Sequence, residues 1–212
     1  QNRNVEAERM NSILTVTSFA ASQDLTIRDT AKLDLGITNS DQDAAIDMWI
    51  KQASGMIASY CQRVFGLETL SETFRPDASL SELILTRYPV ASIASITEDG
   101  TSLDTTDFEV DPSNGIVTRL SSDTPTCWTA NKIVVAYDAG YELLTGLPHD
   151  IERACLSLVK QMRAQASRDP MAKRIEIPDV RTVDYWVGRI GENGALPPDV
   201  VDLLAPYRNW RL

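Results

Sequence analysis

Two long helical patterns frame a central stretch of different periodicity, and this arrangement limits the folds open to the chain. Apolar residues recur at gaps of three and four within residues 40–65 and again within residues 148–167. Pro148 stands where the first turn of a helix favours proline. This spacing predicts two amphipathic helices. The residues that form the two stripes are Ile46, Trp49, Ile50, Ala53, Ile57, Tyr60, Cys61 and Val64, then Ile151, Ala154, Cys155, Leu158, Val159 and Met162.

Between the helices, residues 67–141 break into short apolar runs that turn residues separate. Asp99-Gly100 and Ser113-Asn114-Gly115 are hairpin-type turns. The pattern predicts a small antiparallel β region of about four to six strands. The runs are Leu83–Leu85, Ile93–Ile96, Phe108–Val110, Gly115–Val117 and Lys132–Tyr137.

These patterns predict an α+β fold in which a helical bundle core is interrupted by an inserted antiparallel β subdomain. We expect the two long helices to pack on each other across the insert and to form a single core. The expected divisions are a flexible N-terminal arm (1–23), one domain (24–205) and a C-terminal tail (206–212). Within the domain we expect helices at 24–33, 40–65, 148–167 and 197–205, the β insert at 67–141 and a long loop at 168–196. An apolar stretch in that loop, Val183–Val187, adds a strand or packs on a neighbour.

The composition narrows the class of protein. The net charge is −10, whereas proteins that wrap nucleic acid tightly need a basic surface. No apolar run approaches the roughly 20 residues that span a bilayer, and the N-terminus lacks a secretory pattern, so we expect no membrane partner and no secretion. Met10 is an alternative start of the natural chain.

A search for catalytic or metal-binding residues gives a negative result. Cys61, Cys127 and Cys155 lie far apart, which favours buried thiols over a metal site. The one histidine, His149, is interpreted as a capping or surface residue. Nucleophile elbows, phosphate-binding loops and zinc-protease motifs are missing from the sequence. We therefore predict that the chain is not an enzyme and holds no cofactor or metal.

The ordered series of features resembles the head–tail connector (head-completion adaptor) proteins of long-tailed bacteriophages, the adaptors that bind below the portal. The resemblance covers roughly residues 25–165 and the C-terminus, but not the segment 168–196. Its carriers are Asp41–Ile46, Tyr60–Phe65, Leu85–Val90, Ile93–Ile96, Phe108–Asp111, Asn114–Val117, Val134–Tyr141, Leu147-Pro148 and Leu203–Arg208.

The resemblance implies a structural virion protein without catalysis. Its protomers assemble as a twelve-membered ring in the neck of the particle, after a stay in the host cytoplasm during assembly. The ring binds the portal protein, receives stopper or tail-terminator proteins below, and prolongs a channel through which double-stranded DNA passes. Another neck component, a stopper or tail-completion protein, is one alternative. A β-based ligand-binding module on a helical stem is another.

Charge is unevenly distributed along the chain. Six acids and no base lie between Glu98 and Asp111, and six bases against one acid lie between Arg153 and Arg174. One hypothesis is a dipolar protomer whose opposite charges meet between neighbours in a ring, disrupted by salt or by Arg163→Glu or Arg168→Glu. Solvated faces, or bases that face DNA, are the alternatives. The candidate contact residues are Glu98, Asp99, Asp104, Asp107, Arg153, Lys160, Arg163 and Arg168.

The C-terminal segment concentrates the residue types that dominate binding hot spots. We interpret it as a tail that docks into the portal. The alternative is a tail that folds back on its own core. The candidate docking residues are Leu204, Pro206, Tyr207, Arg208, Trp210 and Arg211.

Overall fold

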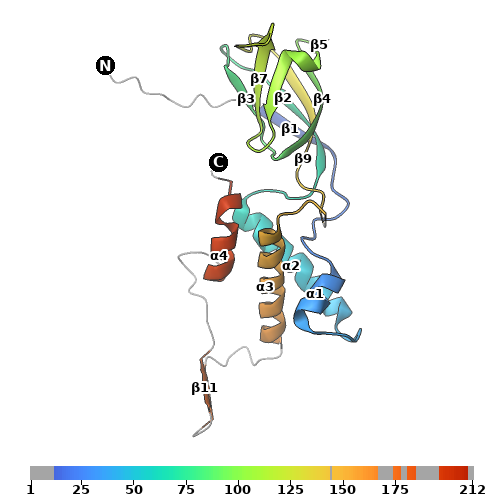
Figure 1. The fold of residues 1–212 in the computed structure, drawn as a ribbon, viewed down its shortest axis with the longest axis vertical. Coiled ribbons are helices and arrows are strands. Elements are labelled where there is room, and N and C mark those ends of the chain that lie inside the picture. Colours follow the sequence, from blue (N-terminus) through green and yellow to red (C-terminus); the bar gives the residue numbers. More distant parts are fainter. Residues whose placement is uncertain (1–11, 144, 167–173, 178–180, 185–195, 210–212) are drawn as a thin grey trace, which may run out of the picture. The chain divides into compact units, whose positions relative to one another are not determined.

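The structure of the chain is a computed structural model that describes residues 12–143, 145–166, 174–177, 181–184 and 196–209. The chain divides into two compact units (Figure 1). The β unit contains Gln1–Ala21 and Gly66–Tyr141, and the helical unit contains Ser22–Phe65 and Glu142–Leu212. No helix among these described residues is both long and apolar enough to cross a membrane.

The β unit is built from two antiparallel sheets. The first has five strands in the order β1-β2-β9-β4-β5, and the second has the order β3-β7-β6 with β8 paired to β7. A 3-10 turn, η1 (Thr105–Asp107), precedes β6. The strands are β1 (Ser12–Ser18), β2 (Glu68–Phe74), β3 (Glu82–Ile84), β4 (Val90–Glu98), β5 (Thr101–Ser102), β6 (Phe108–Asp111), β7 (Ile116–Ser121), β8 (Thr124–Thr126) and β9 (Ile133–Ala139).

Alternation along the central strands gives the β unit a hydrophobic core of its own. In β9, Ile133, Val135, Tyr137 and Ala139 are buried and the residues between them are partly exposed, as expected for a strand with one buried face. The core cluster combines residues of both sheets with the indole of Trp128, which is fully buried and donates to the carbonyl of Val117 (3.3 Å).

A carboxylate lies inside this core. The Glu72 side chain on β2 is fully buried and accepts hydrogen bonds from the Tyr137 hydroxyl (2.9 Å), the Thr86 backbone N–H (3.0 Å) and the Thr86 hydroxyl (2.5 Å). Burial, together with the adjacent Glu72 carboxylate, raises the pKa of Tyr137. The three donors satisfy a group that would otherwise be costly to bury, and they tie the segment before Pro89 to β2.

The helical unit consists of α1 (Arg28–Leu35), α2 (Asp43–Cys61), α3 (His149–Ala166), α4 (Pro198–Leu204) and a 3-10 turn, η2 (Ala205–Tyr207). The two stripes predicted from the sequence face inward. Ile46, Trp49, Ile50, Ala53 and Ile57 are buried on α2. Ile151, Ala154, Cys155, Leu158 and Val159 are buried on α3, which lies beside α2 (Figure 1). A two-stranded hairpin, β10 (Arg174–Ile177) with β11 (Arg181–Asp184), belongs to the segment between α3 and α4.

The α+β class is confirmed, but several details of the prediction need correction. Residues 12–18, expected within a flexible arm, form β1 and pair with β2. The β region has eight strands between residues 67 and 141, and it has its own core and is not a small insert on a helical core. β2 was missed because its inward positions include Glu68 and Glu72, which break the apolar alternation. The first helix starts later than expected, at Arg28, and the loop 168–196 includes β10 and β11.

Candidate interaction surfaces

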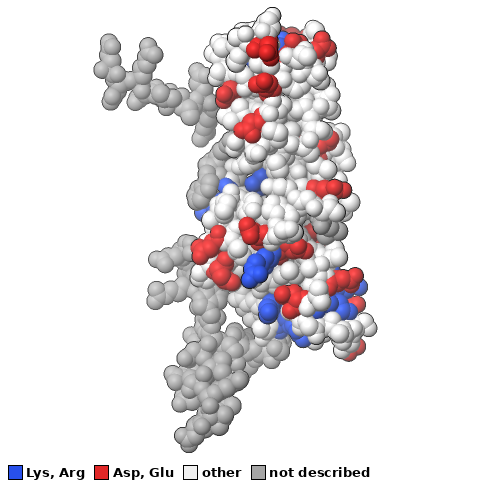
Figure 2. Space-filling view, in the orientation of Figure 1, with Lys and Arg blue, Asp and Glu red and all other residues white. Residues whose placement is uncertain are grey.

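The β unit is strongly acidic. Residues 66–141 contain twelve Asp or Glu against four Lys or Arg, while the whole chain has a net charge of −10. On the face seen in Figure 2, carboxylates dominate over the β unit, whereas basic and acidic side chains are intermixed on the helical unit. Like charges repel, so the β unit is poorly suited to contact an identical β unit or DNA phosphates.

Three of the four acids predicted to contact a neighbour are held within the protomer. Arg119 on β7 donates from Nε to Glu98 Oε2 (3.4 Å) and from Nη1 to the Asp107 carbonyl (2.8 Å), and its Nη1 lies 3.9 Å from Asp107 Oδ1. The Asp99 carboxylate accepts the backbone N–H groups of Asn131 (3.2 Å) and Lys132 (2.8 Å). Asp99 and Gly100 both have positive φ, as the predicted hairpin turn requires. These acids close turns and pair strands.

Asp104 is the predicted acid that keeps a free carboxylate in the described part of the chain. It is exposed and precedes η1 without a side-chain capping hydrogen bond. Glu109 on β6 is also exposed, and no ion pair links it to another described residue. Asp104 and Glu109 are thus two exposed acids of the β unit without an ion pair among the described residues, and a contact to a neighbour stays a prediction.

The predicted bases separate in the same way. Arg153 and Lys160 are exposed on α3, and neither forms an ion pair within the described residues. Their spacing of seven residues places them on one helix face. Arg163 is partly buried, and its Nη1 donates to the carbonyl oxygen of Leu35 (3.0 Å), which braces α3 against the end of α1. Arg168 lies outside the described residues.

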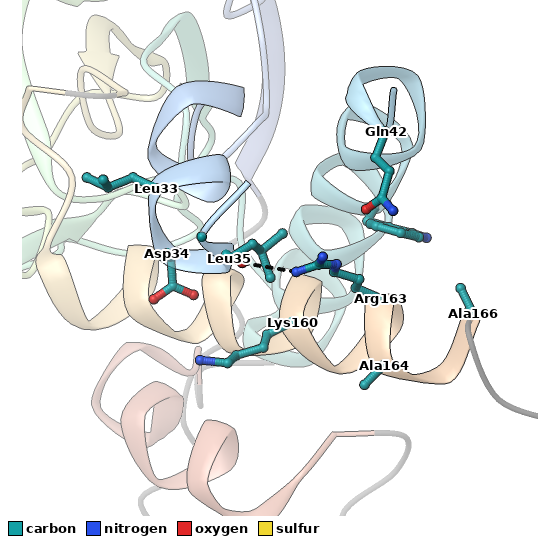
Figure 3. A pocket seen from close by; sticks show the side chains of 10 residues that line it. Leu33, Asp34, Leu35, Gln42, Lys160, Arg163, Ala164 and Ala166 are labelled. Atoms are coloured by element: carbon teal, nitrogen blue, oxygen red, sulfur yellow. Dashed lines mark hydrogen bonds between the residues drawn. The ribbon is translucent and has the colours of Figure 1, made fainter. Parts of the chain in front are cut away.

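An open groove lies beside this brace. Its volume is about 760 Å³, and it lies between the end of α1, the first half of α2 and the end of α3. Figure 3 shows Arg163 reaching to Leu35, with Lys160 and Asp34 at the rim. Trp49, only 8% exposed, and Ala164 supply apolar surface. The groove combines apolar surface with both signs of charge, a composition typical of protein contacts.

A set of ion pairs that the sequence did not reveal joins α1 to α2. Arg28 binds the Asp47 carboxylate through two nitrogens and lies 3.5 Å from Asp43, while Lys32 Nζ lies 2.7 Å from Asp43 Oδ1. The hydrogen bond from Arg28 lowers the pKa of Asp47. Each partner comes from a different helix, so sequence spacing alone gave no signal of these contacts.

The C-terminal residues fold back on α2. Leu204, one of the residues predicted to dock into the portal, is fully buried within the protomer. Arg63 Nη1 donates to the Tyr207 carbonyl (3.3 Å), and the Arg208 guanidinium lies 5.4 Å from the centre of the Tyr60 ring. The Asn209 backbone N–H donates to the Cys61 carbonyl (2.8 Å).

Some of the remaining predicted docking residues are described by the structure, and others lie at the end of the chain that it does not describe. Pro206 is exposed in η2, whereas Trp210 and Arg211 lie outside the described residues. Through residue 209, the structure favours the alternative of a tail folded on its own core.

The described residues contain no group of three or more metal-ligating side chains. Burial raises the pKa of the Cys61 thiol to about 11 and that of Cys155 to about 12, so neither is a ready nucleophile near neutral pH. Cys127 is exposed. His149 is exposed and begins α3, in keeping with the surface role predicted for it.

Comparison with known proteins gives one family and a set of similar structures. The model of the head completion protein family matches residues 25–210. No curated protein matches the sequence significantly. A chain from the neck of an empty gene transfer agent particle, solved with C6 symmetry, shares 16% identity at a TM-score of 0.57, covering 94% of this chain and 97% of that one.

Two further similar structures come from native particles. A chain from the neck solved with C12 symmetry shares 15% identity at a TM-score of 0.56, and one from the virion shares 16% at 0.54. Both alignments cover 94% of this chain and 97% of the other. At these identities the likeness establishes a common fold.

Proposed function

The chain belongs to the head completion protein family, and from this premise we propose that it is the adaptor of a head–tail connector, forming a ring beneath the portal. Members of this family are structural components of phage-like particles and not enzymes. The family match over residues 25–210 is the observation that carries the proposal. In the proposed role, the ring extends the DNA channel and offers an attachment platform to stopper or tail proteins.

Ring assembly is supported by the kind of surfaces that the protomer presents. Similar chains occupy particle necks solved with C12 and C6 symmetry. A closed ring needs two different complementary surfaces on each protomer. One such surface is the exposed basic face of α3 with Arg153 and Lys160, and the other contains the exposed Asp104 on the β unit. The two surfaces are complementary in charge. We propose that they meet between neighbours, with twelve copies in the ring.

The portal-docking part of the proposal concerns the end of the C-terminal segment. Tyr207, Arg208 and Asn209 contact the end of α2 and Arg63 just after it, so they form a stem on the helical unit. We propose that Trp210 and Arg211, which follow this stem, are the portal-docking residues. Trp and Arg combine a large contact area with polar ends, as hot-spot residues do.

Passage of DNA without tight binding fits the charge of the protomer. Phosphate binding needs Lys and Arg, and each neutralised phosphate adds affinity. The twelve acids of residues 66–141 oppose such binding, and their repulsion favours movement of DNA past a channel wall.

Mixing the purified chain with purified portal, followed by electron microscopy, tests the proposal. The expected result is a symmetric ring attached to the portal. A matched variant with Trp210→Ala and Arg211→Ala should remain folded and leave the portal bare. If the unmodified chain stays monomeric beside bare portals, or joins only particles that already carry another adaptor, the adaptor role is wrong.

A further inference from the structure

One long strand of the β unit has an open edge. β1 is the outer strand of the five-stranded sheet, and no backbone hydrogen bond from another described residue reaches its outer side. On the opposite side of the sheet, β4 makes backbone hydrogen bonds beyond the short strand β5. The Leu103 N–H donates to the Ile96 carbonyl (2.9 Å), and the Val90 N–H donates to the Pro112 carbonyl (2.8 Å). The edge strands β3 and β6 have only three and four residues, whereas β1 has seven.

The sequence of β1 lacks the usual protection of an edge strand. Natural edges carry charged residues, proline or a bulge that prevent pairing with other chains. Ser12–Ser18 contains no charged residue and no proline, and its irregular register lies only at the end, between Val16 and Ser18. Ile13 is 63% exposed. Such an edge is suited to accept a further strand from a partner.

A second element of the same chain, the β10–β11 hairpin, has no strand partner among the described residues. β10 and β11 form a two-stranded sheet that pairs with no other described strand. Hairpins of two strands are marginally stable in water unless they gain another strand or a hydrophobic surface. In the sequence, Ile175 and Ile177 alternate with charged residues along β10, and the register pairs Val183 of β11 with Ile175.

The open edge and the hairpin match each other in charge and pattern. In β1, Leu14 and Val16 pack against the core, and Thr15 between them is exposed. A hairpin added to this edge can align the alternating apolar positions of its sequence with Leu14 and Val16 and so extend the core. Its strands carry two arginines and two acids, so no net charge opposes the acidic β unit. Two acidic β units meeting edge to edge would instead repel each other.

We propose that the β10–β11 hairpin of one copy adds to the outer edge of β1 in a neighbouring copy. The contact joins two different surfaces of the same chain, so it can repeat from copy to copy and closes a ring where the rotation between copies allows it. Main-chain hydrogen bonds give the contact its affinity, and the alternating apolar residues give its register. This inference rests on the proposed ring assembly, which it supplies with a specific joint.

Cross-linking between differently labelled copies tests the joint. The full-length chain with Cys127→Ser, which removes the exposed thiol, is prepared once with Thr15→Cys on β1 and once with Thr182→Cys on β11. The two are mixed, assembled on portal and oxidised mildly. We expect a disulfide-linked pair containing one copy of each variant, formed only in assembled rings. A double variant that carries Thr15→Cys and Thr182→Cys in the same chain should give a ladder of linked copies.

A matched control replaces Thr15→Cys by Thr69→Cys, an exposed threonine on β2, one strand further into the sheet. This control should give no linked pair. Electron microscopy of the same samples verifies that rings form. The hairpin joint is wrong if rings form but the double variant links only within single chains, links to portal, or does not link at all. The adaptor role would still stand in that case. If no variant and no unmodified chain assembles, both proposals fail.

Discussion

The backbone N–H of Asn209 donates to the carbonyl oxygen of Cys61 over 2.8 Å, so the C-terminal segment is part of the helical unit up to this residue. The bond satisfies one of the carbonyl groups that the end of α2 leaves without a helical partner. Together with the Arg63 contact to Tyr207 and the Arg208 contact to Tyr60, it separates an anchored stem from the residues that follow.

Two truncations should therefore behave differently. Ending the chain after Asn209 should leave the melting temperature within about 2 °C of the full chain, because surface residues away from packed contacts contribute little. It should abolish attachment to portal. Ending the chain after Leu204 removes the stem and should lower the melting temperature clearly. Differential scanning calorimetry checks both, and equal melting temperatures would contradict the anchored stem.

Charge reversal on α3 should affect assembly and folding separately. Lys160→Glu should weaken ring assembly at low salt and leave the unfolding free energy nearly unchanged, because Lys160 is exposed. Arg163→Glu should destabilise the monomer by about 1–2 kcal/mol, because the Leu35 carbonyl loses its donor. Urea titration and sedimentation measure the two effects. The contact proposal fails if assembly is insensitive both to Lys160→Glu and to salt.

The site of the buried Glu72 carboxylate should not tolerate an uncharged side chain of the same size. Glu72→Gln should destabilise the β unit by about 1–3 kcal/mol, because an amide nitrogen would then face donors that now bind a carboxylate. Glu109→Gln, at an exposed position in the same unit, should change stability by less than about 0.5 kcal/mol. Chemical denaturation of the two variants compares them, and equal stabilities would argue against the network.

The ion pair between Arg28 and Asp47 predicts a specific response to acid. The pKa of Asp47 lies below its ordinary value of 3.8 in the folded chain, since Arg28 stabilises the ionised carboxylate. Its contribution to stability is therefore present above the unfolded pKa and disappears as the pH falls through the folded pKa. Asp47→Asn should be less stable than the parent at pH 6, and the difference should shrink at pH 2–3.

Asp202→Asn provides the control, because Asp202 is exposed on α4 and no ion pair links it to a described residue. This variant should differ little in stability from the parent at pH 6. Circular dichroism of the helical signal during urea titration gives the measurement. A difference for Asp47→Asn that persists or grows in acid would refute the pair's role.

The three thiols should react with alkylating reagents in two classes. Cys127 is exposed and should be labelled in the native protein. Cys61 and Cys155 are buried with raised pKa values, so they should react only after unfolding. Mass spectrometry after brief maleimide treatment should find one label on the native chain and none on Cys127→Ser. Native labelling of Cys155 would show that α2 and α3 separate readily.

The sequence was most informative where one face of an element is buried by neighbours in the same chain. The stripes of α2 and α3 and the alternation of β9 follow the residue pattern, because each buries one side only. β1 and β2 escaped prediction for opposite reasons. β1 is a partly exposed edge strand far in sequence from its sheet, and β2 places two glutamates inward.

The predicted contact residues show the same limit. Runs of charge indicate that acids and bases gather, but not which of them pair within the protomer. Arg119 neutralises Glu98 although 21 residues separate them, and Arg163 binds a carbonyl on α1. Such long-range pairing depends on tertiary structure. Among the predicted contact residues that the structure describes, Asp104, Arg153 and Lys160 are exposed without an ion pair in the protomer, and the contact role of the whole set stays a prediction.

The most direct measurement is a cryo-electron microscopy reconstruction of the neck of intact particles that carry this chain, made without imposed symmetry. We expect twelve copies in one ring in contact with the portal, with residues 210 and 211 at that contact. Density for the chain elsewhere in the particle, or a ring separated from the portal by another protein, would contradict it.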